Sequence, residues 1–351
     1  MELLKQTIAN IKELDQESMK LAEERSDSLI KPPGSLGVME EVVVRMAGIY
    51  GNPLPAVGEK VVMVMAGDHG VVAEGVSAFP QEVTPQMVMS FLWGGAAINV
   101  LSRHAGAKVV ITDVGIAAPP IDDPRVNQCR IKNGTDNMAK GPAMSREEAV
   151  QGIELGIRLA QEQIEQGAKM LATGDMGIGN TTPSTAILAV FSGLDVEEIT
   201  GRGTGLNDQG LKLKQQVIRQ AIELNRPNSL DGIDVLAKVG GLEIAAMAGV
   251  ILGAAANRIP VVIDGFISGA AALIAKAIAP ISVEYMLASH LSQEPGHKMM
   301  LKELGLKPLL HLDMRLGEGT GAATAFLIFD GALKCHSEML TFAEAGVSNK
   351  D

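Results

Sequence analysis

One pattern recurs along this chain and constrains its fold more than any other feature: a short apolar run, a turn of glycine with a polar residue, then a helical stretch. Continuous apolar strands that alternate with helices are typical of parallel strands covered on both faces. We therefore predict an α/β fold with a Rossmann-like layered parallel sheet and helices on both faces. Ligands of such sheets bind beyond the carboxyl ends of the strands, where these polar turns fall. The predicted strands are residues 60–66, 108–112, 169–173, 260–263 and 308–312.

The composition excludes some classes of protein. The chain has 351 residues, of which 46% are apolar, so it can bury a substantial core. Its formal net charge of −11 argues against a surface that gathers nucleic acid through a basic field. A small anionic substrate would need backbone amides, a helix N-terminus or a placed Lys or Arg. We expect small-molecule substrates and no nucleic-acid partner.

The cysteines and the apolar segments predict the location of the protein in the cell. Cys129 and Cys335 lie far apart and form neither a disulfide framework nor a zinc motif. The N-terminus carries charges within its apolar stretch and does not resemble a signal peptide. The apolar segments 240–256 and 265–280 are rich in Ala and Gly and carry charges, which indicates buried helices and not membrane spans. We predict a cytoplasmic protein without a membrane partner.

Both ends of the chain show helical patterns. Residues 2–29 form a charged amphipathic stretch that stops before Lys31-Pro32-Pro33-Gly34, and residues 333–345 form a second one. We expect the α/β catalytic domain at residues 30–330 and a small helical subdomain from residues 1–29 and 331–351; packing of these helices on the sheet is the alternative. The apolar residues expected on the inner side of the first stretch are Leu3, Ile8, Ile11, Leu14 and Leu21.

The strongest single motif is a glycine-rich turn followed by a helix start, at residues 174–184. Its glycines let the backbone turn sharply and present amides, while Thr181 or Thr182 can cap the helix that Pro183 starts. This arrangement suits an anion, although a tight turn with a capped helix is the simpler interpretation. It is neither a P-loop nor a full dinucleotide fingerprint. A second cluster, Gly201-Arg202-Gly203-Thr204-Gly205, precedes Lys212 and Lys214, which can supply a charge for phosphate or belong to a solvated helix face.

Glu318 is the acidic residue of most interest. It lies between Gly317 and Gly319, so a ligand can approach its carboxylate without meeting neighbouring Cβ atoms. The simpler interpretation is a solvated loop glutamate. Asp68 and His69 form another acid and imidazole pair after a predicted strand, for which a structural role is favoured over a catalytic one.

Six motifs in order carry a resemblance to a known family. Together they resemble the nicotinate-nucleotide:dimethylbenzimidazole phosphoribosyltransferases over roughly residues 30 to 325. The resemblance implies transfer of the phosphoribosyl group of nicotinate mononucleotide to 5,6-dimethylbenzimidazole, which gives α-ribazole 5′-phosphate and nicotinate for the lower ligand of cobalamin. It also implies a homodimer. The motifs lie at residues 31–37, 67–71, 79–84, 174–182, 201–205 and 311–323.

The same resemblance implies roles for individual residues. Glu318 matches the general base that takes the N–H proton of the benzimidazole. Asp175 is expected as a second acid near the ribose, at a position where the family often has the longer Glu. No metal and no other cofactor is implied, because this transfer releases no pyrophosphate. The expected nucleotide and phosphate residues are Gly177, Gly179, Asn180, Thr181, Gly203, Thr204, Gly205, Lys214 and Arg315, and the expected base residues are Phe79, Gln86, Met87 and Leu316.

Three alternative functions account for fewer of these sequence features. A Rossmann-type dehydrogenase should carry the full glycine fingerprint in its first strand-helix unit, followed by an acidic residue, and that pattern is missing. A nucleotide-binding protein without catalytic activity would explain the glycine turns but leave Glu318 without a purpose. A ribokinase-like or P-loop phosphotransferase would need carboxylates for a Mg²⁺-nucleotide.

Overall fold

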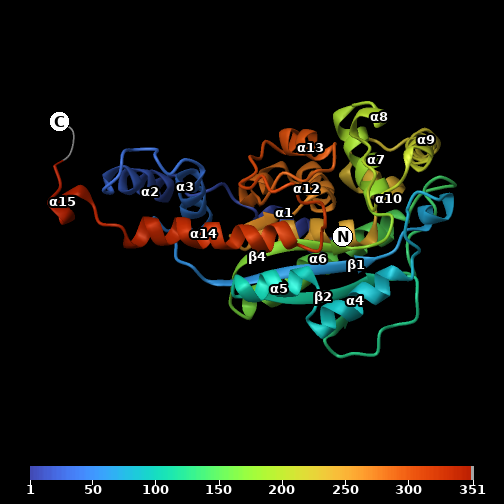
Figure 1. Cartoon of the computed structure of the whole chain (residues 1–351), viewed down its shortest axis with the longest axis horizontal. Coiled ribbons are helices and arrows are strands. Elements are labelled where there is room, and N and C mark those ends of the chain that lie inside the picture. The colour runs from blue at the N-terminus through green and yellow to red at the C-terminus, as the bar shows by residue number, and fades with distance from the viewer. Residues whose placement is uncertain (349–351) are drawn as a thin grey trace.

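A parallel sheet of six strands forms the centre of the computed structural model, which describes residues 1–348. The strand order is β3-β2-β1-β4-β5-β6 and all pairs are parallel, which confirms the predicted fold class (Figure 1). The order reverses between β1 and β4, and ligands of such sheets bind at this switch point. The strands are β1 (Glu59–Gly67), β2 (Ala107–Gly115), β3 (Val126–Gln128), β4 (Ala168–Met176), β5 (Val261–Ile263) and β6 (Met286–Ala288).

Four of the five predicted strands are present as β1, β2, β4 and β5. The prediction of a strand at 308–312 is wrong, because that segment makes only one bridge, between Leu310 and His290. The structure adds β3 and β6, which have three residues each and give too short an apolar pattern to be read from sequence.

Helices cover both faces of the sheet because alternate residues of each strand point to opposite sides. Val61, Met63 and Met65 of β1 belong to one apolar core, and Val62 and Val64 belong to the other. The first core packs against α6, α10, α11 and α12, and the second against α3, α4, α5 and α14. Helices α11 and α12 confirm the two buried helices predicted from the apolar segments.

The helices, in chain order, are α1 (Glu2–Asn10), α2 (Gln16–Ser28), α3 (Val38–Tyr50), η1 (Gly70–Glu74), α4 (Val83–Trp93), α5 (Ala97–His104), α6 (Arg146–Glu165), α7 (Thr181–Ser192), α8 (Val196–Ile199), α9 (Asp208–Asn225), α10 (Gly232–Val239), α11 (Leu242–Ala256), α12 (Phe266–Ile278), η2 (Pro280–Tyr285), α13 (His297–Leu304), α14 (Thr320–Glu338) and α15 (Phe342–Ala345). None of them combines the length and apolarity needed to cross a membrane.

The terminal helices differ from their prediction. The stretch 2–29 is two helices, because Asp15 accepts a hydrogen bond from the Ser18 amide and starts α2 anew. Leu21 is exposed, contrary to the prediction, whereas Ile11 and Leu14 are buried. At the other end a single long helix, α14, starts at Thr320 and replaces most of the helix predicted at 333–345. Residues 349–351 of the predicted subdomain lie outside the described residues.

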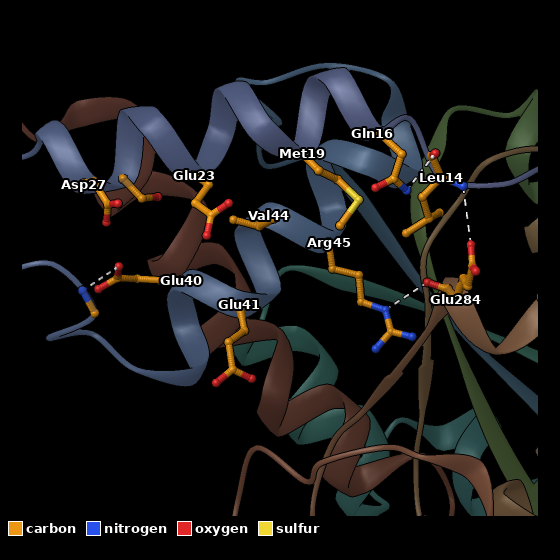
Figure 2. Close-up of a pocket in the computed structure, with 12 residues that line it drawn as sticks. Leu14, Gln16, Met19, Glu23, Asp27, Glu40, Glu41, Val44, Arg45 and Glu284 are labelled. Carbon is orange, nitrogen blue, oxygen red and sulfur yellow. Dashed lines mark hydrogen bonds between the residues drawn. The ribbon is translucent and has the colours of Figure 1, made fainter.

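Figure 1 shows α2, α3 and the end of α14 gathered beside one end of the sheet. A cavity of 600 Å³ lies between α2 and α3, where Glu23, Asp27, Glu40 and Glu41 give it an acidic wall (Figure 2). Arg45 donates to the carbonyl oxygen of Glu284, just before β6 begins. This cavity therefore lies near the amino end of β6, opposite the edge where the ligand is expected.

Candidate active site

Three buried aspartates lie at the carboxyl ends of neighbouring strands. Asp68 follows β1, Asp175 is the next-to-last residue of β4, and Asp264 follows β5. The register of the sheet pairs Met65 with Asp175, so β1 and β4 end at the same level. A fourth buried acid, Glu318, lies in the turn that precedes α14. The expected ligand edge therefore collects carboxylates that are mostly shielded from water.

The turn that carries Glu318 has an unusual backbone. Gly317, Glu318 and Gly319 all have positive φ, of 84°, 63° and 88°. A residue with a side chain rarely adopts this conformation, and such residues cluster at functional sites. Glu318 is only 5% exposed, so the alternative of a solvated loop glutamate is excluded.

Asp264 holds this turn in place. Its Oδ2 accepts a hydrogen bond from the amide of Gly319 at 3.2 Å, and its Oδ1 accepts one from Ala322 at 2.9 Å. A carboxylate at this position satisfies free amides in the first turn of α14 and complements the helix dipole. Burial raises the pKa of Asp264 to about 7, although these amides favour its charged form. Asp264 follows the predicted strand 260–263 but was not predicted as a site residue.

The Glu318 carboxylate is buried and partly unsatisfied. Its Oε2 has no hydrogen-bond partner among the described residues. Burial raises the pKa of Glu318, and the backbone amide of Ile98 near the start of α5 opposes this shift. A buried carboxylate with a free oxygen and a raised pKa is suited to accept a proton.

Asp175 lies against the Glu318 turn. A Cβ atom added to Gly317 would lie 3.3 Å from Asp175 Oδ2, so the carboxylate packs on the backbone next to Glu318. The side-chain amide of Asn180 donates to the same oxygen at 2.9 Å. The pKa of Asp175 is raised well above its usual value, first by burial and then by the charges of Asp264 and Glu243.

Lys214 joins the two glycine-rich turns. Its Nζ donates to Thr181 Oγ1 at 2.7 Å and to the Gly201 carbonyl oxygen at 3.3 Å. The side chain is fully buried, and burial lowers its pKa to about 8. The predicted cap is wrong in detail, because α7 begins at Thr181 and its N-cap residue is Asn180, whose side chain binds Asp175.

A cavity of 230 Å³ lies between these turns. Eight of the predicted site residues line it: Phe79, Asp175, Asn180, Thr181, Gly203, Thr204, Arg315 and Leu316. The other lining residues were not predicted as site residues; they are Gly265, Phe266, Ile267, His290, Ser292, Glu294 and Gly317, and of these Gly317 was named as a neighbour of Glu318. The position of Gly265, directly after Asp264 at the end of a predicted strand, is the sequence feature that could have identified it as a site residue.

The remaining predicted residues lie outside this lining. Gly177 packs against the end of β1, where an added Cβ atom would lie 2.2 Å from the Gly67 carbonyl oxygen. Gln86 is exposed on α4, and Met87 packs against the second core. Gly179, Gly205 and Lys214 lie in or behind the two glycine-rich turns, and Glu318 follows the lining residue Gly317.

His69 is paired away from the cavity. Its Nε2 lies 2.8 Å from Oε1 of Glu243 on α11, and both side chains are buried. Burial alone would lower the pKa of His69, but the Glu243 carboxylate, with help from Asp68, raises it.

The described residues contain no group of three or more His, Cys, Asp or Glu side chains arranged to hold a metal ion.

The chain is similar to known proteins over nearly its whole length. A phosphoribosyltransferase family model, DBI_PRT, matches residues 11–347. The nicotinate-nucleotide–dimethylbenzimidazole phosphoribosyltransferase of Desulforamulus reducens is 62% identical over 99% of both chains. The enzyme of the same name from Chloroflexus aggregans is 56% identical over 100% of this chain and 99% of its own.

A solved structure of the same family is also similar to this chain. The crystal structure of CobT from Thermus thermophilus superposes with a TM-score of 0.91 at 46% identity, covering 95% of this chain and all of the other. The similarity thus extends over nearly the whole chain. The chain belongs to the nicotinate-nucleotide–dimethylbenzimidazole phosphoribosyltransferase family.

Proposed function

We propose that this protein transfers the phosphoribosyl group of nicotinate mononucleotide to 5,6-dimethylbenzimidazole, with Glu318 as the general base. The products are nicotinate and α-ribazole 5′-phosphate, the nucleotide of the cobalamin lower ligand. The observation that carries the role of Glu318 is its buried carboxylate with a free oxygen, held in a fixed turn beside the cavity. A nucleotide-binding protein without catalytic activity has no use for such a group.

The reaction moves one proton and exchanges one bond. One benzimidazole nitrogen forms a bond to the anomeric carbon of the ribose, while the N–H proton of the other nitrogen passes to Glu318. The bond from the anomeric carbon to the nicotinate ring breaks, and its electron pair neutralises the pyridinium nitrogen. Configuration inverts from β to α. A carboxylate whose pKa is raised toward the working pH accepts a proton more readily than an ordinary glutamate.

The buried acids suit a donor that carries a positive ring. Asp175, Asp264 and Glu318 share a region in which burial opposes their negative charge. A bound pyridinium ring would favour the charged form of each carboxylate. Asp175 is the acid that lines the cavity, and we assign it the position near the ribose, where positive charge develops during transfer.

The donor phosphate is assigned to the two glycine-rich turns. The Lys214 ammonium group donates hydrogen bonds to Thr181 of the first turn and to the Gly201 carbonyl oxygen of the second, so it connects both turns. Arg315 lines the same cavity and adds a second cation. The benzimidazole is assigned to the apolar side of the cavity, where Phe79 and Leu316 are found. No pyrophosphate leaves in this reaction, so it does not need a Mg²⁺ clamp.

Release of nicotinate tests this function directly. The purified protein is mixed with nicotinate mononucleotide and dimethylbenzimidazole in the presence of a chelator, and both products are quantified by chromatography. We expect equal amounts of nicotinate and α-ribazole phosphate. Reactions without dimethylbenzimidazole control for simple hydrolysis. Absence of both products would contradict the proposal, and oxidation or reduction of a nicotinamide cofactor would favour the dehydrogenase alternative.

We also propose that the protein is a cytoplasmic homodimer. Trp93 at the end of α4 is 74% exposed, which supports an apolar contact at this position. The two free cysteines, Cys129 and Cys335, fit a reducing compartment. Light scattering of the wild type and of Trp93→Ser tests the dimer: a dimeric wild type with a monomeric variant is expected. A monomeric wild type contradicts the dimer.

A further inference from the structure

Thr84 connects two strand-end turns through one hydroxyl group. It lies in the first turn of α4 and is fully buried. Its Oγ1 donates to Asp68 Oδ1 at 2.7 Å and accepts from the backbone amide of Ile178 at 3.1 Å. A hydroxyl can donate one hydrogen bond and accept others, and here both capacities are used between separate elements.

The Asp68 end of this connection is firmly anchored. The other carboxylate oxygen of Asp68 accepts from the amide of Ala117 at 2.9 Å. The backbone amide of Asp68 donates to Gly115 at the end of β2, and its carbonyl oxygen accepts from Thr135. Through the hydrogen bonds of Asp68, Thr84 is therefore connected to the carboxyl ends of β1 and β2.

The Ile178 end lies inside the donor turn, which we define as residues 177–180. Ile178 stands between Gly177 and Gly179, so the orientation of its peptide constrains those of both glycines. Gly177 already contacts the end of β1, and an added Cβ atom at Gly179 would lie 2.5 Å from Val72 Cγ2. The Thr84 hydroxyl thus fixes an amide in a turn that is otherwise held by close backbone packing.

The segment before α4 has a second connection to the same edge. Gln81 donates from its side-chain amide to the His69 carbonyl oxygen at 2.9 Å. Phe79, two residues earlier, lines the cavity on the side assigned to the benzimidazole. Thr84 therefore lies between the segment that carries the base side of the site and the turn that carries the donor side.

Two other buried threonines of this chain, Thr7 and Thr185, use their hydroxyls within their own helices. Thr7 donates to the Leu3 carbonyl and Thr185 to the Thr181 carbonyl, each four residues earlier in its own helix. Such bonds satisfy a buried hydroxyl without linking elements. The Thr84 hydroxyl instead donates across to another element, which a purely space-filling threonine does not need.

We propose that Thr84 is a positioning residue whose hydroxyl sets the donor turn relative to the base side of the cavity. This inference rests on the proposed function and deepens it, because it names the bond that relates the two substrate sites. Without the hydroxyl, Asp68 Oδ1 would lose its donor and the Ile178 amide would lose its acceptor, so the donor turn could shift against α4. Small displacements of this kind cost catalysis more than folding.

The test compares variants of nearly equal shape. Thr84→Val removes the hydroxyl and keeps the branched side chain, whereas Thr84→Ser keeps the hydroxyl. Thr7→Val is the matched control, because it removes a buried hydroxyl far from the cavity. We expect Thr84→Val to lower kcat/KM for nicotinate mononucleotide by about 10- to 100-fold, and Thr84→Ser to stay within about threefold of wild type. Thr7→Val should also stay within about threefold.

Further measurements separate positioning from folding. Calorimetric affinity for nicotinate mononucleotide should fall in Thr84→Val, while thermal unfolding should show a shift similar to that of Thr7→Val. A folded Thr84→Val with donor kcat/KM within about threefold of wild type overturns the proposal. If Thr84→Val does not fold, Thr84→Ala is judged by the same criterion. Independently, the Ile178 amide of the wild type should be protected from hydrogen exchange, and free exchange in the folded protein overturns the proposal.

Failure of this inference can be told apart from failure of the proposed function. A wild type that binds nicotinate mononucleotide but releases no nicotinate contradicts the transfer reaction, and the affinity comparison still tests Thr84. A wild type that does not bind the donor contradicts both. Normal transfer by the wild type with unchanged kinetics in Thr84→Val contradicts only the role of Thr84.

Discussion

Asp264 accepts a hydrogen bond from the backbone amide of Gly319, at 3.2 Å, across 55 positions of the chain. The carboxylate that ends β5 thereby fixes the residue next to Glu318, and a second bond to Ala322 fixes the start of α14. The added Cβ of Gly319 would lie 2.5 Å from Val62 Cγ1, so this turn packs directly on β1. The position of Glu318, the proposed general base, thus depends on β5, on β1 and on the N-terminus of α14.

Replacing Asp264 by asparagine should damage both stability and catalysis. The asparagine amide offers one acceptor oxygen, and its NH₂ group would face one of the two backbone amides. We expect a loss of about 1–3 kcal/mol in the free energy of unfolding, measured by denaturant titration. The kcat should fall as well, because Glu318 loses a fixed support. Asp136→Asn is the control, since that side chain is 67% exposed. Unchanged stability would show that the two amides do not need the carboxylate.

The contribution of Asp264 to the stability of the protein should decrease as pH rises from about 4 to about 7. The pKa of Asp264 is raised from 3.8 to about 7 in the folded protein, mainly by burial. Between these values the folded state keeps a proton that the unfolded state has released, so rising pH favours unfolding. Asp175 and Glu318, whose pKa values are also raised, act in the same direction.

Denaturant titrations at several pH values measure this effect. The stability of the wild type relative to that of Asp264→Asn should fall over this pH range, because the variant has no proton to lose at this position. Equal slopes in the two proteins would show that Asp264 does not titrate in this range.

Glu318→Gln should reduce kcat by about 10²- to 10⁴-fold and leave the affinity for nicotinate mononucleotide nearly unchanged. Glutamine keeps the size of the side chain but cannot accept the benzimidazole proton. In the wild type, the rate should also fall at low pH with a midpoint above 4.5, because burial raises the pKa of Glu318. Glu303→Gln, on the surface of α13, is the control. Near-normal turnover of Glu318→Gln would remove this residue from the role of base.

The parts of this structure that the sequence predicted are those with a strong local signal. The cores of β1 and β4 were predicted because their continuous apolar runs follow from burial on both faces. Residues 308–312 have a similar apolar character, yet they make one bridge to His290 beside β6. Only the three-dimensional packing of that edge decides between a strand and an extended loop.

The site residues likewise divide into those that could be predicted from the sequence and those that could not. Glu318 was singled out because it lies between two glycines, and Asp175 was expected from the family resemblance. Glu243 and His290 gave no such signal, because Glu243 lies within an apolar helix and His290 follows a strand too short to recognise. Their places at the carboxylate cluster and the cavity result from long-range contacts, which a single sequence does not display.

Lys214→Met should weaken the binding of nicotinate mononucleotide by about 10- to 100-fold in KM, with a smaller effect on kcat. Methionine fills the buried channel of the lysine side chain but cannot donate to Thr181 or to the Gly201 carbonyl oxygen. Because burial lowers the pKa of Lys214 to about 8, the ammonium charge should be lost as pH rises through that value. Donor KM in the wild type should therefore increase above about pH 8, although a bound phosphate will hold the proton more tightly.

The pH dependence distinguishes Lys214 from other cations. In Lys214→Met the KM for the donor should be high and independent of pH in this range. Lys212→Met is the matched control, because Lys212 lies on the exposed side of α9. A variant at Lys214 that keeps the rise in KM above pH 8 would assign that titration to another group, and an unchanged KM would place the phosphate elsewhere in the cavity.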